Sequence, residues 1–114
     1  MSVVIWHNPG CSTSRKALDL LREHGVEPTV RNYLKDPPSE KEIRAVLRAL
    51  GAKDPHALVR KKDKAYAELD VGSMSGDDVI AAMAERSSLI ERPVVIAGEK
   101  ARIGRPIELV LEIL

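Results

Sequence analysis

The chain has 114 residues, of which 44% are hydrophobic and 31% are charged. These values suit one globular domain with a single hydrophobic core. Only 3% of the residues are aromatic, and the formal net charge is +1. The sequence therefore lacks the aromatic platforms that single-stranded nucleic acids stack on and the broad basic field that attracts a duplex. We expect no nucleic-acid partner.

The sequence also gives no sign of a membrane or an oxidising compartment. No stretch approaches the roughly 20 apolar residues that a membrane-spanning helix needs. Residues 1–6 run directly into a strand pattern, without the basic region or cleavage site of a signal peptide. Cys11 is the only cysteine, so an internal disulfide cannot form. We expect a cytoplasmic protein with no membrane partner.

The first third of the chain predicts a strand, a helix and a second strand. Residues 3–6 are apolar and rich in β-branched side chains, which favours a buried strand. Residues 12–24 carry a helical apolar stripe, and Gly25 supplies a C-terminal stop. Residues 29–33 indicate a less apolar strand, expected at a sheet edge. This order within about 30 residues is typical of a parallel βαβ unit.

A helical middle and a second β-containing segment follow. Ser39 and Glu42 have the spacing of a capping box, and the helix they open ends at Gly51. Further helices are expected over residues 54–60 and from a cap at Ser75. The last third predicts strands at 93–97 and 101–103, then a helix of about eight residues ending at the C-terminus. The whole predicts one α/β domain over residues 1–114. Its fold would be a thioredoxin/glutaredoxin-like mixed sheet with a helical subdomain inserted at about residues 37–90.

Cys11 lies between the first predicted strand and the first predicted helix. The free amides and the positive dipole end of a helix favour negative charge at this place. Arg15 lies one turn along, and His7 precedes the loop, so we predict a Cys11 pKa of roughly 3.5–7.5. Ser14 completes a Cys-x-x-Ser pattern and is expected to hydrogen-bond at the helix start. Because serine cannot form a disulfide, a resolving thiol must come from another molecule. His7 either stabilises the thiolate or orients the loop.

Three arginines, Arg60, Arg92 and Arg105, are notable for their sequence context. The first ends a short apolar segment, the second precedes Pro93 and a predicted strand, and the third lies between Gly104 and a proline. A guanidinium group donates two parallel hydrogen bonds and stays charged, which suits a tetrahedral oxyanion. Sequence spacing alone leaves open whether the three meet at one point or lie separately on the surface.

With these motifs in view, the chain closely resembles the ArsC arsenate reductase family from end to end. The matching segments are His7 to Arg15, Tyr33-Leu34, Pro37-Pro38, Ala57 to Arg60, Glu91 to Val95 and Gly104-Arg105-Pro106. The resemblance implies a thioredoxin-like fold with an inserted helical subdomain and a cis peptide bond before Pro93. The sequence departs from the family pattern in ending at residue 114, where well-known arsenate-resistance members continue.

The resemblance also implies a mechanism and roles for six residues. Cys11 would be the nucleophile that attacks arsenate, and glutathione would then reduce the arsenic as a co-substrate. Glutaredoxin would remove the glutathione left on the cysteine. The oxyanion would be bound by Arg60, Arg92 and Arg105, and His7 and Ser14 would help to lower the cysteine pKa. No metal and no tightly bound cofactor are implied, and we expect a monomer.

Three other functions remain open from the sequence. A glutathione-dependent reductase of protein or small disulfides would use Cys11 in the same way without needing all three arginines. The related Spx proteins share the fold and bind RNA polymerase, but they commonly carry Cys-x-x-Cys and lack the Gly-Arg-Pro segment. Ser14 and Arg105 therefore favour the reductase. A family member that only binds a partner is disfavoured by the presence of Cys11 and the three arginines.

Overall fold

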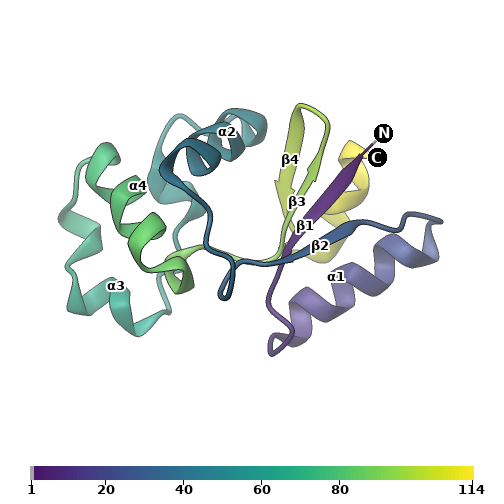
Figure 1. Cartoon of the computed structure of the whole chain (residues 1–114), viewed down its shortest axis with the longest axis horizontal. Coiled ribbons are helices and arrows are strands. Elements are labelled where there is room, and N and C mark those ends of the chain that lie inside the picture. The colour runs from purple at the N-terminus through teal and green to yellow at the C-terminus, as the bar shows by residue number, and fades with distance from the viewer. Residues whose placement is uncertain (1) are drawn as a thin grey trace. The chain divides into compact units, whose positions relative to one another are not determined.

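The computed structural model describes residues 2–114, which divide into two compact units. The first unit combines residues 2–36 with residues 92–114 and contains the β-sheet. The second unit, residues 37–91, is built from helices and turns (Figure 1). The element order is β-α-β, a helical block, then β-β and a final helix, as the sequence predicts.

The first unit contains one four-stranded mixed sheet. Its strands are β1 (Val3–His7), β2 (Thr29–Asn32), β3 (Val94–Ala97) and β4 (Lys100–Ile103), in the order β2-β1-β3-β4. β1 runs parallel to β2 and antiparallel to β3, and β3 runs antiparallel to β4. The predicted parallel pair and the edge position of β2 are both confirmed. Each strand lies within a residue or two of its predicted bounds.

One face of this sheet packs against α1 (Ser12–Glu23) and the C-terminal 3-10 helix η4 (Ile107–Ile113). Alternate strand residues point to the same face, and Val3, Ile5, Val95 and Ala97 form the sheet's share of a buried apolar cluster. The helices complete the cluster with Leu18, Leu21, Val110 and Ile113. Figure 1 shows α1 running along the sheet, with the yellow C-terminal segment beside β3 and β4.

The C-terminal helix is present where the sequence predicts it, but its winding differs from an α-helix. η4 is a seven-residue 3-10 helix. The apolar residues Ile107, Val110 and Ile113 recur every three residues, which matches three residues per turn. The last two are buried in the core of the first unit. Packing of this three-residue stripe explains why the segment winds more tightly than an α-helix.

The second unit contains α2 (Glu40–Leu50), α3 (Lys64–Glu68) and α4 (Gly76–Glu85). The predicted capping box at the start of α2 is confirmed. Ser39 Oγ accepts the Glu42 N–H at 3.1 Å, and the Ser39 N–H donates to Glu42 Oε1 at 3.0 Å. Gly51 ends the helix with a φ of 70°, a left-handed conformation that glycine adopts at little cost. Ser75 caps α4 through the Asp78 N–H, also as predicted.

Two helical predictions for the second unit need correction. The helix expected over residues 54–60 is only the 3-10 helix η1 (Pro55–Leu58). Val59 instead forms an isolated antiparallel bridge with Ile90, and the Arg60 N–H donates to the Leu89 carbonyl at 2.7 Å. These backbone bonds to a distant segment end the helix early. The sequence reading also missed α3, which spans five residues and is too short to show a helical period.

Two further 3-10 turns complete the second unit, η2 (Val71–Ser73) and η3 (Ser87–Leu89). Neither has a side-chain cap. A three-residue turn carries no apolar periodicity from which to predict it. Short backbone turns therefore account for most of the difference between the predicted and observed structure of residues 37–91.

Leu21 is a stringent test of the core of the first unit, because its side chain is fully buried. We expect Leu21→Ala to lower the free energy of unfolding by about 2–5 kcal/mol, through lost apolar burial and the cavity left behind. Urea denaturation measures this loss. Leu34 is 41% exposed, and Leu34→Ala should change stability by no more than about 0.5 kcal/mol. Equal losses from the two variants would contradict the assignment of the core.

Candidate active site

The sheet topology brings three connecting segments together at one end of the sheet, where β1 and β4 end and β3 begins. Trp6 pairs with Val94, and Val94 pairs with Ile103. The segment after β1, the segment before β3 and the segment after β4 therefore begin side by side. They carry Cys11, Arg92 and Arg105 respectively. The peptide bonds before Pro93 and before Pro106 are both cis, and the first of these was expected from the family resemblance.

Cys11 occupies the N-cap position of α1 and is partly buried. Burial by itself raises the pKa of the Cys11 thiol, but a hydrogen bond from the Arg92 side chain, the Arg92 charge and the backbone amides of Ser14 and Thr13 together outweigh it. The pKa falls from its ordinary value of 9.0 to about 7, within the range expected from the sequence. A substantial fraction of the thiol is therefore ionised at neutral pH.

Arg105 also lies against the sulfur. Its Nη2 is 3.8 Å from Cys11 Sγ, and its Nε donates to the Arg92 carbonyl oxygen at 2.7 Å. The bond to the Arg92 carbonyl fixes the orientation of the Arg105 guanidinium group. Cys11, Arg92 and Arg105 thus form one cluster in the first unit, with a nucleophilic sulfur flanked by two cations.

Gly104 allows this cluster to form. The sequence alone does not predict this steric role. The Gly104 N–H donates to the Pro93 carbonyl at 2.9 Å. A Cβ at position 104 would lie 2.9 Å from Pro93 Cγ and 3.2 Å from a methyl carbon of Val110. Only a residue without a side chain allows this close approach. The Gly-Arg-Pro pattern was the available signal, but its steric reason depends on the register of β3 and β4.

Ser14 is fully buried and contacts the loop through two different groups. Its hydroxyl lies 2.7 Å from His7 Nδ1 and accepts the Asn8 N–H at 3.1 Å. Its backbone amide is one of the groups that lower the pKa of Cys11. The Ser14 side chain therefore supports the residues around the cysteine, while its main chain acts on the sulfur.

His7 is also buried, at the end of β1. Burial lowers its pKa, and the positive charges of Arg15 and Arg22 lower it further. The imidazole is therefore neutral near pH 7, and its hydrogen bond with Ser14 fixes its orientation. That a neutral His7 helps to lower the cysteine pKa stays a prediction.

Arg60 belongs to the second unit, unlike the other two arginines singled out from the sequence. It is partly exposed and follows the bridge between Val59 and Ile90 directly. Its main-chain N–H is fixed by the Leu89 carbonyl, so the segment that carries it is anchored within its own unit. Convergence of Arg60 with Cys11 on one ligand stays a prediction.

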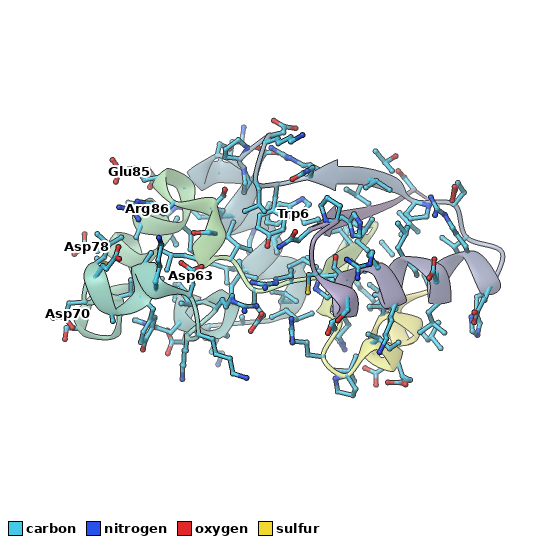
Figure 2. All side chains as sticks on the ribbon, turned by 90° about the horizontal axis from the view of Figure 1, so that it is seen from below. Trp6, Asp63, Asp70, Asp78, Glu85 and Arg86 are labelled. Carbon is cyan, nitrogen blue, oxygen red and sulfur yellow. The ribbon has the colours of Figure 1, made fainter. Side chains whose placement is uncertain are left out.

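Over residues 2–114, no cluster of three or more His, Cys, Asp or Glu side chains could hold a metal ion. Figure 2 shows Asp70, Asp78 and Glu85 projecting from the outside of the second unit, where all three are exposed.

Within the same described range, no helix combines the length and the apolar character needed to cross a bilayer.

Comparison with known proteins agrees with this architecture. The family model described as "ArsC family" matches residues 6–113. The arsenate reductase of Haemophilus influenzae is 45% identical, with both chains covered completely. The uncharacterized protein YfgD of Escherichia coli is 48% identical over 97% of this chain and 95% of its own length. The solved structure of the arsenate reductase from Vibrio cholerae superposes with a TM-score of 0.96 at 48% identity, and the match covers 100% of this chain and 98% of that one.

The protein has a thioredoxin-like α/β fold with a single cysteine at the start of its first helix. The family match extends over nearly the whole chain. The chain belongs to the ArsC family.

The pKa of Cys11 should depend on Arg92 more than on any other side chain. We expect Arg92→Gln to raise this pKa by about one unit or more, because the substitution removes the guanidinium hydrogen bond to the sulfur and the adjacent positive charge. The rate of iodoacetamide alkylation, followed from pH 5 to pH 10, gives the titration midpoint. The wild-type midpoint should lie at about 7. Arg44→Gln, which removes an exposed cation paired with Asp77, is the matched control. An ordinary thiol midpoint in the wild type would contradict the assignment.

Proposed function

We propose that this protein reduces arsenate to arsenite through Cys11, with glutathione and glutaredoxin supplying the electrons. The observation that carries the proposal is the cluster of a thiolate and two guanidinium groups, Cys11 with Arg92 and Arg105. The names of the relatives support arsenate as the substrate, since the Haemophilus influenzae and Vibrio cholerae proteins are both called arsenate reductases.

In the first step, the Cys11 thiolate attacks the arsenic atom, and one arsenate oxygen leaves as water after protonation. The product is an adduct with a sulfur–arsenic bond in which arsenic is still pentavalent. A pKa of about 7 supports this step, because it supplies thiolate at neutral pH while keeping the sulfur nucleophilic. Arg92 and Arg105 would offset the negative charge that accumulates during the attack.

In the second step, glutathione thiolate attacks the Cys11 sulfur, and the electron pair of the sulfur–arsenic bond stays on arsenic. Arsenic is thereby reduced by two electrons to arsenite, and Cys11 is left in a mixed disulfide with glutathione. Glutaredoxin thiolate then attacks the glutathione sulfur and releases Cys11 as a thiolate. The single cysteine supports this route, because every further thiol must come from another molecule.

The remaining site residues take supporting roles in the proposal. Arg60 would be the third guanidinium on the oxyanion, donating paired hydrogen bonds. His7 and Ser14 would keep the Cys11 loop in the form that favours the thiolate, through the contact between His7 Nδ1 and Ser14 Oγ. We also expect a monomer with no metal and no tightly bound cofactor. A cytoplasmic location would supply reduced glutathione.

The function is tested by arsenate-dependent NADPH oxidation, with glutathione, glutaredoxin and glutathione reductase supplied. We expect turnover in the wild type, and we expect Cys11→Ser to reduce it to the rate without enzyme, because a serine hydroxyl is not ionised at neutral pH. Omission of glutaredoxin should also stop turnover. A reactive thiol with no arsenate-dependent turnover would favour a disulfide reductase or a polymerase-binding relative instead.

Arg60 is tested separately, because its proposed role is in binding rather than in ionising the cysteine. We expect Arg60→Gln to lower kcat/KM for arsenate by about 10- to 100-fold, the loss expected for a hydrogen bond to a charged group. The alkylation midpoint of Cys11 should stay unchanged. Lys61→Gln, at the adjacent exposed position, controls for the loss of one positive charge. An equal effect from both variants would show that Arg60 contributes only general electrostatic attraction.

A further inference from the structure

Asn8, which carries no charge, makes three hydrogen bonds within the loop between β1 and α1, and Arg15 Nη1 also donates to the Pro9 carbonyl there at 2.7 Å. Asn8 Oδ1 accepts the Gly10 N–H at 2.9 Å, and the Asn8 carbonyl accepts the Cys11 N–H at 3.0 Å. The Asn8 N–H donates to Ser14 Oγ at 3.1 Å. Three groups of Asn8 therefore fix three points of the segment from Gly10 to Ser14.

These hydrogen bonds set the backbone conformation at Cys11, and that conformation determines which backbone amides face the sulfur. The bond from the Cys11 N–H to the Asn8 carbonyl closes a β-turn through Pro9 and Gly10, and the side-chain bond to Gly10 braces the turn from inside. Cys11 then takes the extended conformation of an N-cap, with φ −101° and ψ 121°. In that conformation an N-cap side chain faces the amides two and three residues on. Those amides belong to Thr13 and Ser14, the two that act on Cys11.

Gly10 provides independent evidence that the position of the Asn8 side chain matters. Gly25, Gly51 and Gly98 have positive φ angles, and Gly10 does not. Glycine at position 10 is therefore not required by backbone conformation. A Cβ at this position would instead lie 3.3 Å from Asn8 Oδ1, closer than such atoms normally approach. The absence of a side chain at position 10 makes room for the Asn8 amide over the turn.

We propose that Asn8 is a positioning residue, which holds the Pro9-Gly10 turn so that the first amides of α1 face the Cys11 thiolate. It acts through the backbone of Cys11, Thr13 and Ser14 and need not touch the substrate. This inference deepens the proposed function and rests on Cys11 being the nucleophile. It assigns to a neutral side chain a part of the thiolate stabilisation that the arginines alone do not provide.

The test is the pH dependence of Cys11 alkylation by iodoacetamide. We expect Asn8→Ala to raise the Cys11 midpoint by about half to one pKa unit, because the freed turn no longer holds the amides against the sulfur. At pH 6 the alkylation rate should fall about 3- to 10-fold, and the rates of the two proteins should converge above the midpoint. Asn8→Ser should give an intermediate shift, since serine forms the same turn more weakly.

Asn32 supplies a matched control at the end of the neighbouring strand. Its Oδ1 accepts the Leu34 N–H at 3.1 Å, which is the same kind of turn two residues on. Asn32→Ala should leave the Cys11 midpoint unchanged. If Asn8→Ala lowers the melting temperature without moving the midpoint, Asn8 is merely structural and the proposal is wrong. If Asn8→Ala does not fold, an unshifted midpoint in Asn8→Ser overturns it equally.

A double substitution tests whether Asn8 and Gly10 act through one contact. Gly10→Ala should displace the Asn8 side chain and raise the midpoint in the same direction. Addition of Gly10→Ala to Asn8→Ala should then shift it little further, since the contact is already lost. Fully additive shifts would contradict the proposal.

The two proposals fail in different ways. Alkylation needs no arsenate, so a wild type without arsenate turnover would overturn the substrate and leave the Asn8 shift intact. If the wild type turns over arsenate but Asn8→Ala leaves the Cys11 midpoint unchanged, the positioning role is wrong and the proposed function stands.

Discussion

Partial burial of Cys11 makes its thiolate less stable, and the residues around it must offset that effect where the strands β1, β3 and β4 meet at one end of the sheet. The offset comes from the side chain of Arg92 and from the amides of Ser14 and Thr13. The guanidinium group and the amides are positioned by different parts of the fold. The amides require α1 to begin at Ser12, and the guanidinium group requires β3 to lie beside β1. The position of the Arg92 guanidinium group beside the sulfur therefore depends on the pairing of Trp6 with Val94.

Elements with a clear pattern could be predicted from the sequence, and elements defined by backbone contacts could not. The apolar run from Val3 predicted β1, and Ser39 with Glu42 predicted the start of α2, because each signal is local. The end of η1 was missed because Val59 pairs with Ile90, about thirty residues away. The five-residue helix α3 was missed because so short a helix shows no period.

The same distinction holds for the candidate site. Cys11 was identified from its place before a helix, and a lowered pKa followed from that place alone. The contact between Arg105 Nε and the Arg92 carbonyl could not be predicted, since it joins segments that only the sheet brings together. The role of Asn8 could not be predicted for a different reason. Its three bonds are local, but an asparagine before Pro-Gly usually indicates nothing more than a turn.

The 3-10 winding of η4 places a restriction on how this segment can change in length. Val110 and Ile113 face the core of the first unit because three residues complete one turn. Insertion of a single residue before Val110 would rotate every later side chain by about 120° and bring a polar residue such as Glu112 toward the core. Insertions or deletions of three residues would preserve the inward stripe. In related sequences, length differences between Pro106 and Val110 should therefore occur in steps of three.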